Sequence, residues 1–468
     1  MTDPTVTSSG TGLAAPSNRG TALQGPSLVA RLDRVPEWSL PYGYLAIIGL
    51  GYFFVFYDIT DIGFGLPAIA QQFHLTGSES LFLALAIGLI GYILGSFVIG
   101  TVSDRYGRLH LLIVTFGLTA LGSFGDAAAT NLFLLSFWRF VTGMGVGAGL
   151  NLVSTYVGEL SPAARRGRIS VLTFLIGILG QAVTPFVALA LVPTFVIGWR
   201  LLFVIGGAVA AVGIGLQPLL PESPRWLVTH GRLEEADRVI TRMEGIAQAR
   251  GQPLPSPRVT EVSLQRGEFP SRYLFRQPYV TRLVLFVTMW FLWYIGNYAF
   301  LGDAATLLVA HGVSIASSIL YLAIGAVGYP VGAVAMLATA DRLERHWLIA
   351  TATGIWLVGM LLIGSLAGAV TVTVGSFLAA LALGMYLQVG YTYTAESFPT
   401  RARTSGFAWS DGLGHLGGAV GALALPALIA STSFFIGFAL IGVTGFAAGL
   451  VALLGPPSTG QRLEHVSA

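Results

Sequence analysis

The sequence contains no cysteine and no lysine, and it is poor in charge of either sign. All 25 basic residues are arginine, and charged residues make up only 10% of the 468 positions. The absence of cysteine excludes disulfides, iron–sulfur clusters and thiolate metal sites. Soluble domains carry about 25% charged residues, so the deficit indicates that most of the surface faces a lipid bilayer.

Motifs for chemistry are also missing. No zinc-ligand spacing, catalytic triad or phosphate-binding loop occurs, so we predict no metal, no cofactor, no nucleic-acid partner and no enzymatic activity. The glycine-rich segment 143–149 lacks the G-x-G-x-x-G spacing and follows no predicted strand. Small residues at this density let membrane helices approach closely, so the segment predicts helix packing.

Long apolar runs dominate the chain instead, and 54% of its residues are hydrophobic. A run of about twenty apolar residues is long enough to cross roughly 30 Å of hydrocarbon. The runs predict an all-α integral membrane protein with twelve transmembrane helices in two six-helix halves, residues 43–217 and 282–455. The spans are predicted at 43–70, 81–102, 110–128, 131–158, 168–192, 197–217, 282–301, 315–339, 346–366, 370–395, 405–430 and 432–455.

The polar segments set the orientation. Arginine is concentrated in alternate short connections, and the positive-inside rule then predicts a multi-pass protein of the cell inner membrane with both termini in the cytoplasm. Residues 1–42 are predicted to be a disordered cytosolic tail, and residues 456–468 a second cytosolic tail. The long connection 218–281 is predicted to be a cytosolic linker with amphipathic helices, because Glu234 and Arg238 lie four residues apart within it.

Charged residues repeat between the two halves. Asp104, Arg105 and Arg108 reappear as Asp341, Arg342 and Arg345, and Glu159 and Arg166 reappear as Glu396 and Arg403. Each pair is separated by 237 residues. A constant offset predicts two copies of one unit inserted in the same orientation, which is the parallel-repeat plan of one large class of transporters.

The loop motifs resemble those of the major facilitator superfamily. The segment GTVSDRYGRLH at 100–110 resembles its cytoplasmic signature G-x3-D-R-x-G-R. The segments ELSPAARRG (159–167), PESPRWL (221–227) and ESFPTRART (396–404) resemble the loop signatures of its sugar-porter branch and of related metabolite–proton symporters. The resemblance covers residues 40 to 455 and implies the major facilitator fold.

The resemblance also implies a cytoplasmic gate made of charge pairs that hold the halves together when the cavity opens outward. The alternative is that the arginines only set the topology. In the second copy Glu344 replaces the signature glycine, which predicts a looser turn. The candidate gate residues are Asp104, Arg105, Arg108, Glu159, Arg166, Glu222, Arg225, Asp341, Arg342, Arg345, Glu396 and Arg403.

Charged residues inside predicted spans are candidates for proton coupling, because burying charge in a membrane costs about 2.5–3.5 kcal/mol each and usually marks an ion or substrate pathway. Asp58 and Asp61 lie three residues apart on one helix face, and Arg139 lies at a similar depth in the fourth span. The resemblance implies that Asp58 and Arg139 form a proton-responsive pair beside Tyr57. The alternative is a static salt bridge.

Asp411 and His415 form a second candidate pair, four residues apart in the eleventh span. Neutral histidine donates and accepts hydrogen bonds and titrates near neutral pH, which suits proton exchange. An Asp–His pair that only seals the inner gate is the alternative.

Polar and aromatic residues at helical spacing are candidates for substrate contact, although lipid-facing or packing roles remain open. The seventh span lacks the glutamine pair usual in sugar porters, which disfavours a hexose, whereas two acids in the first span resemble aromatic-acid symporters. The candidates are Trp290, Trp293, Tyr294, Asn297, Tyr298, Gln181, Gln388, Tyr391 and Trp409.

These observations together predict a secondary active transporter. We expect it to move a small polar or anionic metabolite, an organic or aromatic acid or a sugar-like compound, by proton symport with alternating access. The alternatives are a uniporter or exporter of the same superfamily, or a nutrient sensor that does not transport. The expected partners are the substrate, a proton and the bilayer, and the fold requires only one chain, so we expect a monomer.

Overall fold

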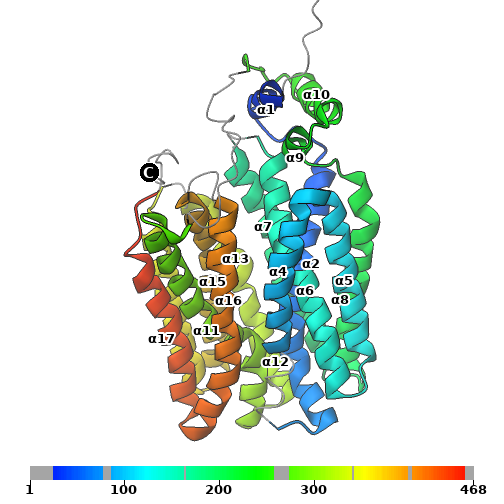
Figure 1. Cartoon of the computed structure of the whole chain (residues 1–468). Helices are drawn as coiled ribbons and strands as arrows, with labels where there is room; N and C mark the ends of the chain where they lie inside the picture. The colour runs from blue at the N-terminus through cyan, green and yellow to red at the C-terminus, as the bar shows by residue number, and fades with distance from the viewer. Residues whose placement is uncertain are drawn as a thin grey trace, which may run out of the picture.

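The computed structural model describes residues 25–76, 86–162, 165–257, 274–339, 342–398 and 403–458. Within these ranges the regular structure is entirely helical (Figure 1). Ten helical stretches are long and apolar enough to cross a membrane, and α4 and α16 pack among them to complete the twelve predicted spans. The all-α membrane fold predicted from the apolar runs is therefore confirmed.

The helices follow the predicted spans closely. The eighth span differs because it consists of two helices, α12 and α13, joined at Val327. The helices of the N-terminal half are α2 (Tyr42–Phe73), α4 (Ile87–Tyr106), α5 (Arg108–Ala128), α6 (Leu132–Leu160), α7 (Arg166–Leu191) and α8 (Gly198–Leu216). Those of the C-terminal half are α11 (Tyr279–Ala310), α12 (Ile315–Ala326), α13 (Gly328–Thr339), α14 (Arg345–Ser365), α15 (Ala369–Glu396), α16 (Arg403–Ser431) and α17 (Phe434–Ala452).

The repeated charged motif forms a different turn in each half. Gly107 separates α4 from α5 with a φ of +100°, a conformation that glycine adopts without steric cost. Glu344, which takes the place of this glycine in the second copy, has a φ of −62° and a ψ of 137°. The second turn therefore uses ordinary extended backbone, and the substitution needs no strained conformation.

The two halves contact each other through α2 with α11, α7 with α12 and α13, and α4 with α16. A very close approach between the halves occurs at Gly63, where an added Cβ would lie 1.9 Å from the carbonyl oxygen of Leu301. At this point the backbones of α2 and α11 are in direct contact, which only glycine permits. Gly63 lies 21 residues beyond the start of α2, so this contact is in the part of the bundle far from the linker.

Three short helices cover one end of the bundle: α1 (Gly25–Asp33), α9 (Pro224–Thr229) and α10 (Leu233–Ala249). We call this the linker end. The described C-terminal residues lie at the same end, where Pro456 accepts a hydrogen bond from Tyr393 at 2.9 Å. Both ends of the described chain therefore lie at the same end of the bundle, and their placement in the cytoplasm stays a prediction.

Residues 25–42 differ from the predicted disordered tail. Leu28 and Leu32 of α1 are buried against the linker. Arg31 forms ion pairs with Asp237 at 2.5 Å and Glu244 at 2.7 Å, both on α10. The prediction failed here because the apolar surface that α1 covers belongs to a segment two hundred residues away. The rest of that tail, most of 258–281 and the chain end after 458 lie outside the described residues.

Candidate transport site

Arg139 is the centre of a buried charge cluster in the N-terminal half. Its Nη1 lies 3.6 Å from Oδ2 of Asp58 and 3.5 Å from Oδ1 of Asp61, which are one turn apart on α2. Their side chains are at most 7% exposed. The structure thus brings Asp58 and Arg139 together, as the sequence predicted, and it adds Asp61 to the same contact.

Asp126 is the fourth member of this cluster, and the sequence analysis missed it. Its Oδ2 lies 3.5 Å from the same Nη1 of Arg139 and accepts a hydrogen bond from Thr142 at 3.2 Å. Asp126 is fully buried, near the end of α5. An acid at the end of an apolar run is usually taken as a boundary residue. The available signal was that the helix that follows carries Arg139 two turns from its start.

The cluster contains more negative than positive charge. Three carboxylates ionised around one guanidinium would leave two negative charges uncompensated in a buried site, which costs several kcal/mol per ion. Protons are the simplest compensation, so the cluster is suited to binding and releasing them. Asp58 has further support from Ser123, whose hydroxyl donates to its Oδ1 at 3.1 Å. Tyr57 instead donates to the carbonyl oxygen of Leu202.

Asp58 and Arg139 face a small cavity between the halves. It has a volume of about 30 Å³ and is also lined by Tyr92 of α4 and Tyr298 of α11. A second cavity of about 20 Å³ is lined by Asn297, Gln181 and His415, and it shares Tyr92 and Tyr298 with the first. Cavities of this size hold about one or two water molecules. The halves must therefore separate before a metabolite can enter.

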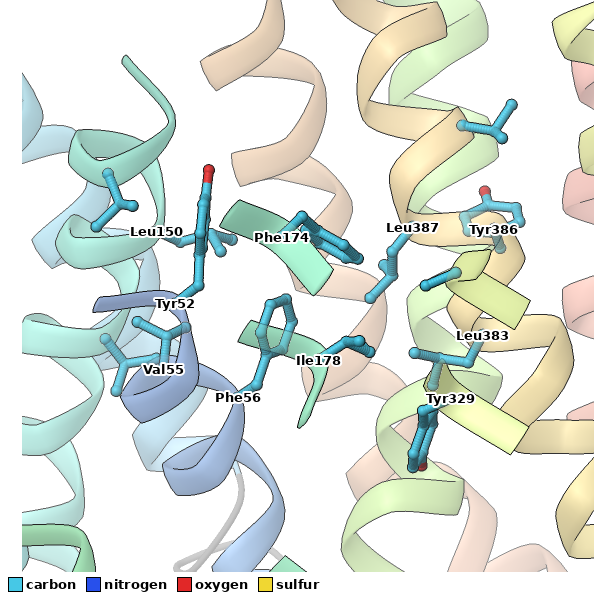
Figure 2. Close-up of a cluster of buried hydrophobic side chains, with 14 of the residues drawn as sticks. Tyr52, Val55, Phe56, Leu150, Phe174, Ile178, Tyr329, Leu383, Tyr386 and Leu387 are labelled. Carbon is cyan, nitrogen blue, oxygen red and sulfur yellow. The ribbon is translucent and has the colours of Figure 1, made fainter. Parts of the chain in front are cut away.

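Apolar side chains fill the rest of the space between the halves on the linker side. Figure 2 shows Phe56 of α2 and Phe174 and Ile178 of α7 facing Leu387 on α15, while Tyr52 of α2 lies beside Leu150. These buried side chains bring the two halves into apolar contact on the linker side of the cavities.

The second predicted pair lies in the C-terminal half, at the wall of the second cavity. Nδ1 of His415 lies 2.8 Å from the carbonyl oxygen of Asp411 and therefore donates to it. Tyr294 donates to Oδ1 of Asp411 at 2.7 Å. The His415 ring also stacks on Tyr92, with ring centres 4.1 Å apart and planes 21° apart. The pair is thus linked to the opposite half through an aromatic contact.

The predicted substrate residues divide into two groups. Those that line the cavities are Tyr294, Asn297, Tyr298, Gln181 and Tyr391. The others pack against neighbouring helices away from both cavities. Trp290 donates to Thr394, Trp293 stacks on Tyr386 at 3.7 Å, Gln388 is buried, and Trp409 packs on Phe97 and Phe275. A substrate role remains a prediction for both groups.

A family model described as "Sugar (and other) transporter" matches residues 44–468. The chain belongs to the sugar (and other) transporter family. It is a membrane transporter of the major facilitator superfamily, and it is not an enzyme.

Individual members of the family are similar over nearly the whole chain. The niacin transporter NiaP of Acinetobacter baylyi is 29% identical over 442 residues, covering 94% of this chain and 99% of the relative. The 4-hydroxybenzoate transporter PcaK of Pseudomonas aeruginosa is 28% identical over 391 residues, covering 82% and 85%. Among solved structures, the proton:xylose symporter XylE from E. coli, bound to 6-bromo-6-deoxy-D-glucose, has a TM-score of 0.73 at 22% identity, covering 91% and 98%.

The charged motifs of this family member lie at the linker end. Arg108 of α5 pairs with Glu159 of α6 at 3.1 Å, and Arg345 of α14 pairs with Glu396 of α15 at 3.3 Å. These repeat-related pairs join helices within one half. Among the described residues these two pairs stabilise each half separately, and the charge-pair gate between the halves stays a prediction.

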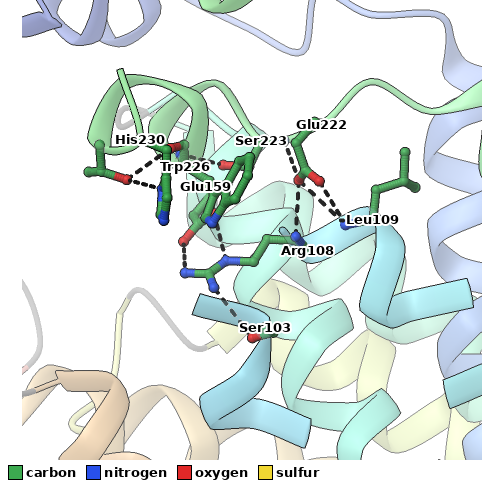
Figure 3. Close-up of polar contacts among 9 residues, drawn as sticks. Ser103, Arg108, Leu109, Glu159, Glu222, Ser223, Trp226 and His230 are labelled. Carbon is green, nitrogen blue, oxygen red and sulfur yellow. Dashed lines mark hydrogen bonds and ion pairs between the residues drawn. The ribbon is translucent and has the colours of Figure 1, made fainter. Parts of the chain in front are cut away.

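The linker is fixed to the N-terminal half at the same place. Figure 3 shows that Glu222 accepts hydrogen bonds from the backbone N–H groups of Arg108 and Leu109, at 3.1 and 3.2 Å, beside the Arg108–Glu159 pair. The carboxylate thereby satisfies free donors at the start of α5. Arg225 pairs with Asp33 of α1. Arg105 and Arg342 are exposed. Asp341 and the side chains of Asp104, Arg166 and Arg403 lie outside the described residues.

Proposed function

We propose that this transporter takes up a small organic anion together with a proton, by alternating access, across the inner membrane. In this orientation the linker end and both termini are cytoplasmic, as the arginine-rich connections suggest. Two relatives carry niacin and 4-hydroxybenzoate in their names, and both compounds are small carboxylic acids. Their names support an organic anion as cargo in preference to a sugar.

The observation that carries proton coupling is the position of Asp58. Of the three acids around Arg139, Asp58 is the one that lines a cavity, and Arg139 lines the same cavity. A proton that arrives through the opened cavity reaches Asp58 first. When Asp58 is protonated, its attraction to Arg139 falls, and the guanidinium becomes available to a carboxylate in the cavity.

Alternating access then exposes the cluster to each side of the membrane in turn. In the described conformation α2 and α11 meet backbone to backbone at Gly63, and apolar side chains close the linker side. With the halves in contact at both places the cavities are too small for a metabolite, so this is the state without substrate. Separation of the halves at the end away from the linker admits a proton and an anion, and separation at the linker end releases both to the cytoplasm.

The test is transport by the purified protein in vesicles with a pH-sensitive dye inside. A symporter acidifies the lumen when nicotinate or 4-hydroxybenzoate is added outside. Asp58→Asn should abolish uphill accumulation but retain exchange of labelled substrate. Asp303→Asn is a matched control, because Asp303 is equally buried but lines neither cavity. Undiminished uphill uptake by Asp58→Asn would contradict the proposal.

Facilitated diffusion is distinguished by the same assay. A uniporter moves labelled substrate without acidifying the lumen, and a sensor without transport activity moves neither label nor protons. In either case Asp58→Asn and the wild type should behave alike in the dye signal.

A further inference from the structure

The strongest unexplained feature is an aromatic stack that joins the two halves beside the charge cluster. Tyr92 of α4 lies against His415 of α16, with ring centres 4.1 Å apart and nearly parallel planes. The His415 ring also contacts Tyr294, with centres 4.0 Å apart. Both Tyr92 and His415 line the second cavity. The contact therefore forms part of the wall that a substrate must meet.

Each ring of the stack is held rigidly by its own half. The α4 backbone at Tyr92 contacts α6 so closely that a Cβ added to Gly147 would lie 2.1 Å from the Tyr92 carbonyl oxygen. On the other side, Nδ1 of His415 is bonded to the Asp411 carbonyl, and α16 packs tightly on α11. Because both rings are fixed, separation of the halves must part them.

The polar atoms around the stack are suited to a ligand. Tyr92 is 2% exposed, yet its hydroxyl has no hydrogen-bond partner among the described residues. Nδ1 of His415 is bonded to the Asp411 carbonyl, which fixes the imidazole beside this hydroxyl. Tyr92 also lines the first cavity with Arg139, which supplies positive charge. A buried hydroxyl without a partner costs free energy unless something else binds it.

We propose that Tyr92 and His415 are the two walls of a slot for a planar aromatic ring, so that the substrate is an aromatic monocarboxylate. This inference rests on the proposed function, in that the cargo is a small organic anion. When the halves part, the ring enters between the phenol and the imidazole and restores on both faces the stacking that the empty protein makes directly. The carboxylate of the substrate then lies on the side of Arg139, beyond Tyr92 and Tyr298, which line both cavities.

This arrangement gives the transporter selectivity for flat rings. A saturated ring of similar size has axial hydrogens and no π-face, so it cannot stack on either wall. Aromatic pairs contribute about 0.5–1.5 kcal/mol beyond the area they bury, which corresponds to about 2- to 12-fold in affinity for each wall. The two walls together predict a preference of about 4- to 150-fold for the aromatic acid.

The experiment is equilibrium binding to the purified full-length protein in detergent at one fixed pH. The probes are nicotinate and benzoate, with cyclohexanecarboxylate as the saturated analogue. We expect the wild type to bind at least one of the aromatic acids about 4- to 150-fold more tightly than the analogue. Tyr92→Leu should weaken aromatic binding by about 2- to 12-fold and leave the analogue unchanged, whereas Tyr92→Phe should keep the preference.

Several results would overturn the inference. These are equal affinities for the aromatic and saturated acids, binding of none of the probes, or Tyr92→Leu weakening both classes equally. Thermal unfolding of each variant separates loss of the slot from loss of the fold. The binding experiment measures no proton movement, so it tests the aromatic slot independently of proton symport. Binding that is selective for aromatic acids, without lumen acidification, would support the slot and contradict symport. Proton-coupled uptake without a preference for aromatic rings would support symport and contradict the slot.

Discussion

At the residue scale, the charge cluster depends on one cation. Arg139 lies within 3.6 Å of Asp58, Asp61 and Asp126, and no other basic side chain among the described residues pairs with them. Removing the cation from a buried pair costs about 3–5 kcal/mol, because the partner charge remains buried without compensation. Arg139 therefore has a structural role as well as a transport role.

We predict that Arg139→Gln lowers the free energy of unfolding by about 3–5 kcal/mol. Adding Asp126→Asn should recover part of this loss, because it removes one of three uncompensated carboxylates and keeps the Thr142 contact. Chemical denaturation in detergent measures both. As a control, Asp237→Asn on the linker surface should give no recovery in the Arg139→Gln background. A double variant less stable than Arg139→Gln would show that Asp126 stabilises the protein by another route.

How much of this site the sequence predicts depends on where each residue lies along its helix. Asp58 and Asp61 stand in the middle of an apolar run, so their burial and shared face follow from helical geometry. The burial of Asp126 does not follow from helical geometry, because its depth is set by the packing of α5 against α6. The role of Tyr92 could not be predicted from the sequence. Tyrosine is common in membrane spans, and only its neighbour across the interface distinguishes this one.

At the element scale, the contact between α2 and α11 controls how closely the halves approach. We predict that Gly63→Ala disfavours the closed state by about 1–3 kcal/mol, since overpacking costs this much and the neighbouring atom is backbone. The equilibrium should shift by about 5- to 150-fold toward opening at the end away from the linker.

The absence of native cysteine makes this shift measurable. Ile59→Cys places one thiol at the wall of both cavities. Its alkylation by a membrane-impermeant reagent added at the far side should become faster in the Gly63→Ala background. Gly354→Ala is the matched control, because an added Cβ there meets nothing within 4 Å. Equal alkylation rates in Ile59→Cys alone, with Gly63→Ala and with Gly354→Ala would mean that the contact between Gly63 and Leu301 does not limit opening.

The docking of α1 on α10 provides a pH-dependent element outside the membrane. Burial alone would raise the pKa of Glu244, but hydrogen bonds from Arg31 and Arg34 outweigh it and hold the pKa below its ordinary value. A carboxylate with a depressed pKa stabilises the docked form fully above its ordinary pKa of about 4.3 and loses this contribution as the pH falls through the docked value.

We therefore predict that α1 stays docked from pH 8 to about 6 and loosens below about pH 4.3. A spin label at Val29→Cys reports this as increased mobility. Glu244→Gln should loosen α1 already at neutral pH and remove the dependence, whereas Glu234→Gln, on an exposed position, should change neither. Acid-induced loosening that persists in Glu244→Gln would assign the effect to another group.

At the scale of the whole molecule, the sequence predicts each half better than the relation between them. Hydropathy defines the twelve spans, and the repeat of Arg108–Glu159 as Arg345–Glu396 defines the two copies. Both features depend only on spacing along one chain. The contacts across the interface depend on shapes that hydropathy does not encode. Gly63 against Leu301 and Tyr92 against His415 are both of this kind.

The number of protons per cycle decides which gradient drives uptake by the whole molecule. Asp58 alone of the three clustered acids faces a cavity, so one proton should accompany one monoanion, and the loaded step carries no net charge. A pH difference of one unit should then support about tenfold accumulation. A potential of 100 mV, worth about 2.3 kcal/mol per charge, should add nothing.

Imposing each gradient separately on vesicles with a potassium ionophore measures both effects, and Asp58→Asn should lose the response to pH. If an inside-negative potential alone increased accumulation by about 50-fold, a second proton would be moving. Asp411 and His415 would be the first pair to substitute, because His415 lines the adjoining cavity and Asp411 lies beside it.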